Sequence, residues 1–70
     1  MINIKLRSIL ERKNMTQSEL AKRTGIRPST ISDLCNNNAD FIKTENLNRI
    51  LKTLKCGLND VLEFRDSDDQ

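Results

Sequence analysis

Short side chains that can donate and accept hydrogen bonds are concentrated in one stretch of this sequence, GIRPSTISDLCNNN at residues 25–38. In a helix, a rotation of about 100° per residue puts the apolar Ile31, Leu34 and Cys35 on one face. The opposite face then carries four polar residues, Ser29, Ser32, Asp33 and Asn36. Because these side chains are short, such a face can approach base edges in a DNA groove closely.

Catalytic and metal chemistry find little support in the composition. The chain has no His, Tyr or Trp and only two glycines, so it lacks a glycine-rich phosphate loop. Its two cysteines, Cys35 and Cys56, have no histidine and no CxxC spacing with which to form a zinc site. We therefore expect no enzyme activity, no metal and no cofactor. The two thiols are expected to stay reduced and to pack as small apolar side chains, with a regulatory disulfide as the alternative.

Two short helices are predicted to position the polar face. Pro28 suits the first turn of a helix over residues 28–36, because its missing N–H would have no partner there. Upstream, Thr16 and Glu19 have the spacing of a capping box, in which each side chain accepts from the other residue's N–H. That signal begins a helix over residues 17–24, and Gly25 suits the left-handed position after it. Two helices joined by a short glycine-containing turn are typical of a helix-turn-helix.

The remaining elements are predicted from apolar spacing and from capping residues. Apolar positions 6, 9 and 10 predict a helix over residues 5–13, and a later stripe predicts a core-facing helix, Leu47, Ile50, Leu51 and Leu54. We expect Thr44 to cap this helix and Gly57 to end it. Phe41 and Ile42 are expected to anchor the loop before it.

The two ends of the domain are less clearly defined by the sequence. Asn59 is expected to cap a last short helix in DVLEF, with Val61 and Leu62 inward. The segment INIK at residues 2–5 alternates apolar and polar residues, which fits either an extended arm or a short strand paired with LEF at 62–64. Leu58, Val61 and Phe64 fit either a core or a dimer contact.

Charge is distributed unevenly along the chain, although the net charge is only +2. Residues 5–27 hold seven basic and two acidic side chains, whereas residues 58–70 hold five acidic side chains and one arginine. A basic front favours a polyanionic partner, with ordinary solvated faces as the alternative. The start of the chain lacks the apolar run of a signal peptide, and no segment predicts a membrane span. We expect a cytoplasmic protein.

The stretch MTQSELAKRTGIRPSTISDLCNNN resembles the helix-turn-helix core of Cro/CI-type regulators, also called the xenobiotic-response-element family. The matching residues are Thr16-Gln17, Glu19-Leu20-Ala21, Gly25-Ile26 and Ser29-Thr30-Ile31-Ser32. The later LNRILKTLKCGLNDVLEF resembles the fourth and fifth helices of that family. Together the matches cover about residues 4–64. The resemblance implies an all-α, compact five-helix, lambda-repressor-like domain over residues 1–64, with the helix-turn-helix at about 16–36. From its composition, the acidic tail at 65–70 is expected to be disordered.

The resemblance also implies a function. Members of the family control transcription in bacteria and phages, usually as homodimers on palindromic double-stranded DNA, and no small-molecule ligand is evident here. The alternative is a protein-interaction module, such as an antitoxin or adaptor, on the same fold. Matched position by position, the residues expected at DNA are Thr16, Gln17, Arg27, Pro28, Ser29, Ser32, Asp33, Asn36, Asn38 and Lys43.

The family pattern assigns different roles to these residues. Gln17 matches a phosphate-contacting position, and three residues match positions that commonly face bases, Pro28, Ser29 and Asp33, with Ser32 beside them. Arg27 has the reach to bind a phosphate or a guanine. The backbone contacts that follow the recognition helix are matched by Asn36, Asn38 and Lys43.

The sequence departs from the family pattern after the recognition helix. The common Glu-Asn-Gly is replaced by Cys35-Asn36-Asn37. We expect an apolar contact between Cys35 and Leu10 in place of the ion pair found in some members. Asn37 is expected to take the left-handed position of the missing glycine.

Overall fold

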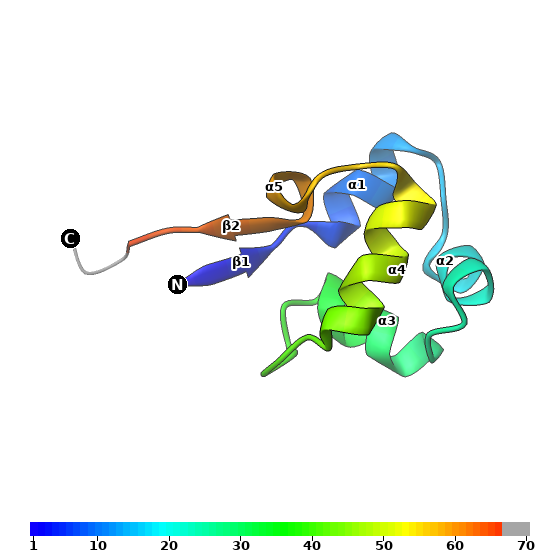
Figure 1. Ribbon diagram of the computed structural model, residues 1–70, viewed down its shortest axis with the longest axis horizontal. Helices are drawn as coiled ribbons and strands as arrows, with labels where there is room; N and C mark the ends of the chain where they lie inside the picture. Colours follow the sequence, from blue (N-terminus) through cyan, green and yellow to red (C-terminus); the bar gives the residue numbers. More distant parts are fainter. Residues whose placement is uncertain (67–70) are drawn as a thin grey trace.

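The chain of the computed structural model starts in one strand of a two-stranded ribbon, passes through five helices and returns as the second strand (Figure 1). The structure describes residues 1–66, so most of the predicted acidic tail, residues 67–70, lies outside the described residues. The elements in chain order are β1 Ile2–Ile4, α1 Leu6–Arg12, α2 Gln17–Thr24, α3 Pro28–Cys35, α4 Thr44–Leu54, α5 Leu58–Val61 and β2 Leu62–Phe64. The five predicted helices are present, and the helix-turn-helix pair α2–α3 begins at the predicted residues.

The ribbon modifies the all-α prediction by adding a small antiparallel sheet. Ile2 pairs with Phe64, Asn3 with Glu63, and Ile4 with Leu62. The strand reading of INIK is therefore correct, and the extension of the last helix through DVLEF is wrong. Residues 62–64 alternate apolar, charged and apolar, which fits a strand with one face toward the protein better than a helical turn.

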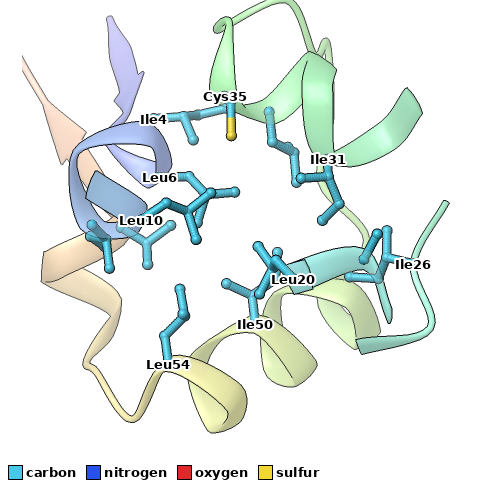
Figure 2. Packing of buried hydrophobic residues seen from close by; sticks show 13 residues of the cluster. Ile4, Leu6, Leu10, Leu20, Ile26, Ile31, Cys35, Ile50 and Leu54 are labelled. Atoms are coloured by element: carbon cyan, nitrogen blue, oxygen red, sulfur yellow. The ribbon is translucent and has the colours of Figure 1, made fainter. Parts of the chain in front are cut away.

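Side chains from β1 and from all five helices pack into one apolar core (Figure 2). α1 contributes Leu6, Ile9 and Leu10, and the other elements contribute Ile4, Leu20, Ala21, Ile26, Ile31, Leu34, Cys35, Ile50, Leu54 and Val61. Leu10 and Cys35 are both buried in this cluster, as the predicted apolar contact between them requires. Leu47 and Leu51 pack at its edge. A core of this size leaves a 70-residue domain only marginally stable.

The capping box at the start of α2 is only half formed. The Thr16 hydroxyl accepts a hydrogen bond from the Glu19 N–H at 3.0 Å, as predicted. The Glu19 carboxylate instead accepts from the Arg23 guanidinium at 2.7 Å. The Glu19 carboxylate therefore pairs with Arg23 one turn further along the helix and not with the Thr16 N–H. The i,i+4 spacing favours such an ion pair.

Several predicted caps and anchors differ in the structure. α4 has Lys43 at its N-cap and Thr44 as its first helical residue, and it ends at a left-handed Lys55 (φ 54°) rather than at Gly57. Gly57 instead begins α5, and its N–H donates to the Asp60 carboxylate at 3.0 Å. The predicted cap Asn59 is therefore wrong, because it is the second residue of α5 and the N-cap lies two residues earlier, at Gly57.

The loop before α4 is anchored by only one of the two predicted residues. Ile42 packs against the core, but the side chain of Phe41 is 76% exposed.

Candidate nucleic-acid interface

The turn between α2 and α3 is held by the predicted Gly25 and by two residues that no local sequence pattern indicated, Thr24 and Arg49. Gly25 is left-handed (φ 75°), as expected. The buried Thr24 hydroxyl donates to the Leu20 carbonyl at 2.8 Å and accepts from the Ile26 N–H at 3.2 Å. From α4, the Arg49 guanidinium donates to the Thr24 carbonyl at 3.4 Å. These bonds tie the end of α2 to the residue after the turn and to α4.

α3 turns its polar residues outward from this turn. Ile31, Leu34 and Cys35 are buried, so the opposite face of the helix is presented to solvent. Pro28, Ser29, Asp33 and Asn36 are exposed and Ser32 is half-buried. The face is therefore convex and accessible, as a helix that enters a groove must be.

A hollow of about 560 Å³ lies beside α3 and collects residues that the sequence separates. Four of the predicted residues line it, namely Arg27, Asp33, Asn38 and Lys43. The exposed Phe41 and the half-buried Asn46 lie at its wall. Arg27, just before α3, and Lys43, just before α4, thus line one hollow next to the polar face. The carboxylates of Asp33 and Asp40 line the same hollow.

The other flank of α3 is tied to α1 by a residue that the sequence analysis missed. The Arg7 guanidinium donates to the Asn36 side-chain carbonyl, and the Asn36 amide donates to the Ser32 hydroxyl at 3.4 Å. Arg7 lies 29 residues before Asn36. No spacing rule links residues so far apart, so only the tertiary structure could reveal this contact.

The N-terminus of α2 offers a different kind of contact. Thr16 already accepts the Glu19 N–H, so its hydroxyl is engaged within the helix start. The first helical residues Gln17 and Ser18 have no acceptor within their own helix for their N–H groups. Together with the helix dipole, these groups form a site that favours an anion such as a phosphate.

The cations of the site differ in their ion pairs from three other arginines of the described residues. Within residues 1–66, salt bridges join Arg23 to Glu19, Arg49 to Glu45 and Arg65 to Glu63. Over the same residues, none joins a carboxylate to Arg7, Arg27 or Lys43. These three side chains are exposed, so their charge is available to an external anion.

Other kinds of site find no support in the geometry of the part of the chain described. No group of three or more His, Cys, Asp or Glu side chains there is placed to hold a metal ion. Among residues 1–66, every helix is too short or too polar to span a bilayer. Both cysteines are free thiols, with Cys35 buried and Cys56 half-buried.

Comparison with known proteins agrees with this geometry. The family model of the Cro/C1-type helix-turn-helix DNA-binding domain matches residues 5–67. An uncharacterised HTH-type transcriptional regulator of Bacillus subtilis (strain 168), YozG, is 35% identical over 68 residues, which span 97% of this chain and 81% of the relative. The chain therefore belongs to the Cro/C1-type helix-turn-helix DNA-binding family.

Proposed function

We propose that this protein is a transcriptional regulator that places α3 in the major groove of double-stranded DNA and the N-terminus of α2 on the phosphate backbone. The observation that carries the proposal is the exposed polar face of α3, flanked by three cations without an ion pair, Arg7, Arg27 and Lys43. We further infer that it acts as a homodimer on a palindromic site, in the cytoplasm of a bacterium or phage-infected cell.

The contacts divide into two kinds. Lys43, Asn38 and the α2 N-terminus with Gln17 would hold phosphates and supply affinity that falls with salt. Ser29, Ser32 and Asp33 would face base edges, where Asp33 can accept a hydrogen bond from cytosine. Pro28 offers only apolar contact, for example with a thymine methyl group.

Arg27 has a special position in this scheme. It is the N-cap of α3, so its side chain leaves the protein next to the first turn of the recognition helix. It also lines the hollow with Lys43, where the Asp33 carboxylate offsets part of the local positive charge. We infer that Arg27 supplies the largest single contribution to affinity, through a phosphate or a guanine.

A fluorescence-polarisation titration tests the proposal. The DNA would first be selected from random duplexes, and its dissociation constant measured over a range of salt concentrations. We expect Arg27→Ala to weaken binding by about 1–3 kcal/mol, the size of a bidentate base or phosphate contact. Lys52→Ala removes an exposed cation near the other end of α4 and should change the affinity little.

The protein-interaction alternative predicts a different outcome of the same titration. A module that holds only a protein partner would show no salt-dependent binding to duplex DNA at micromolar protein and low salt. That result would remove the DNA-binding proposal, because phosphate contacts alone should give measurable binding under those conditions.

A further inference from the structure

The ribbon of β1 and β2 extends away from the helices (Figure 1). At its far end an apolar pair of side chains is exposed. Ile2 and Phe64 are direct cross-strand partners, and their side chains are 64% and 71% exposed. They lie on the same face as Ile4 and Leu62, which pack against the core. The apolar face of the ribbon is therefore covered by the core at Ile4 and Leu62 and exposed to solvent at Ile2 and Phe64.

The two outer edges of the ribbon are not equivalent. Asn37 covers the edge of β1, because its side-chain carbonyl accepts the Ile4 N–H at 2.8 Å and its amide contacts the Ile4 carbonyl at 3.4 Å. The same amide donates to the Asn3 side chain at 2.6 Å. β1 is thus closed to a further strand at Ile4.

The edge of β2 is open at Phe64. The Arg65 N–H donates to the Met1 carbonyl at 2.8 Å and the Lys5 N–H to the Val61 carbonyl at 2.7 Å, so residues 61, 63 and 65 point their backbone groups into the ribbon. Phe64 must then point its N–H and carbonyl outward. Within residues 1–66, no side chain bonds to the backbone of Phe64.

We propose that a second copy of this chain pairs with β2 through an antiparallel contact centred on Phe64, which joins the two ribbons into a four-stranded sheet. The inference deepens the homodimer of the proposed function by naming its interface. Each Phe64 would donate its N–H to the carbonyl of the other copy. Their side chains would lie side by side on the apolar face, where they cover one another and Ile2.

Charge selects this register over its neighbours. A two-fold axis at Glu63 would oppose two glutamates, and an axis at Arg65 would oppose two arginines. An axis at Phe64 places Glu63 of each copy opposite Arg65 of the other, in the closer type of cross-strand pair. Within one chain these side chains already contact at 3.2 Å, on the face opposite Phe64. The hydrogen bond from Asn3, followed by the charge of Arg65, lowers the pKa of Glu63, so it is ionised at neutral pH.

A charge-exchange experiment tests the interface without DNA. Glu63→Arg leaves two positive residues on the edge, and Arg65→Glu leaves two negative residues. Each variant alone should weaken self-association by about tenfold, since both cross-strand pairs become repulsive. An equimolar mixture of the two should restore the dimer, because every pair across the axis is then of opposite charge. Sedimentation equilibrium at about 100 µM protein suits a contact at the small end of the interface range.

The mixture separates this interface from general damage to the ribbon. Glu63 also accepts a hydrogen bond from Asn3 at 3.3 Å, so a substitution there can loosen the strand pair. Such loosening is the same in the mixture as in each variant alone, and only an intermolecular contact gives recovery on mixing. Failure of the mixture to associate more than its components would overturn the proposal.

A disulfide gives an independent test. Residues opposite each other in a hydrogen-bonded antiparallel pair have Cα atoms about 5.5 Å apart, within the range of a disulfide. Phe64→Cys should therefore give a covalent dimer under mild oxidation. Phe41→Cys is the matched control, because Phe41 is equally exposed but lies in the loop before α4. Equal cross-linking of the two variants would contradict the interface. Salt-dependent binding of monomeric Glu63→Arg to a single half-site would show that the DNA-binding function stands even if the interface fails.

Discussion

Asn37 combines a backbone role with a side-chain role at one position. Its φ of 59° is left-handed, as the sequence predicted, and its side chain closes the edge of β1 through Ile4. The two roles predict opposite effects of glycine. Glycine would relieve the left-handed strain, but it would leave the half-buried Ile4 N–H without its acceptor.

We expect the lost hydrogen bonds to dominate in Asn37→Gly. The variant should be less stable by about 1 kcal/mol, because a part-buried donor loses its partner while asparagine itself tolerates the left-handed region. Asn37→Ala should be less stable by about 2 kcal/mol or more, since it loses the bonds and adds strain. Urea unfolding of both variants measures the two effects. A glycine variant more stable than the natural chain would show that strain outweighs the edge contact.

The titration of the buried Cys35 thiol makes the stability of the fold depend on pH. Burial raises the pKa of its thiol above the usual 9.0, and the nearby positive charge of Arg7 partly opposes the shift. In the pH range between the unfolded and the folded pKa, the folded state therefore binds more protons than the unfolded state. The stabilisation that the protonated Cys35 thiol contributes is fully present below the pKa of this thiol in the unfolded state. It is lost as pH rises through the higher pKa of the folded state.

Comparison with Cys35→Ala isolates this effect. The difference in unfolding free energy between the natural chain and the variant should shrink as pH rises from about 8 to about 10. Cys56, whose pKa burial and Asp60 also raise, is present in both proteins and cancels. A difference that stays constant across this range would mean that the Cys35 thiolate is solvated in the folded state.

At the scale of elements, the helix-turn-helix depends on one buried hydroxyl. Thr24 binds both the Leu20 carbonyl and the Ile26 N–H, so it joins the end of α2 to the segment that leads into α3. Thr24→Val keeps the shape but leaves the buried Ile26 N–H without an acceptor. We expect a loss of about 1–3 kcal/mol in stability and weaker DNA binding, because the angle of α3 is less well fixed.

Thr24→Ser is the matched control for this prediction. Serine keeps the hydroxyl and removes only a methyl group, so it should retain most of the stability and most of the DNA affinity. Urea unfolding and polarisation titrations of both variants decide the question. If valine and serine give equal losses, the methyl packing and not the hydroxyl holds the turn.

The elements themselves could be predicted where the signal is local. The N-cap at Thr16, the glycine after α2 and the proline that begins α3 act within a few residues, so the bounds of α2 and the start of α3 were confirmed. The position of Arg7 against Asn36 depends on packing between distant segments and had no such signal. The predicted caps of α4 and α5 were wrong because the N-caps of both helices lie before the predicted residues, at Lys43 and Gly57, and neither residue makes a side-chain cap hydrogen bond.

At the scale of the whole molecule, the core and the proposed DNA-reading face share one eight-residue helix. Ile31 is 0% exposed at the centre of the core, and its neighbours Ser29, Ser32 and Asp33 form the polar face. If α3 binds DNA as proposed, folding and DNA binding are thermodynamically linked. DNA that binds only the folded state adds about 2.7 kcal/mol of stability when its free concentration is about 100 times its dissociation constant.

This linkage predicts how variants respond to DNA in thermal unfolding. Ile31→Val should lower the Tm of the free protein, because it costs about 0.5–1.5 kcal/mol in a small core. Selected DNA at one fixed concentration should raise the Tm of this variant and of the natural chain by similar increments, since the polar face is unchanged. Arg27→Ala should show the reverse pattern, with a nearly normal Tm when free and a smaller increment with DNA. If Ile31→Val also lost its increment, the packing of α3 would set the shape of the reading face as well as its stability. The recognition surface would then depend on the core beneath it as much as on its own side chains.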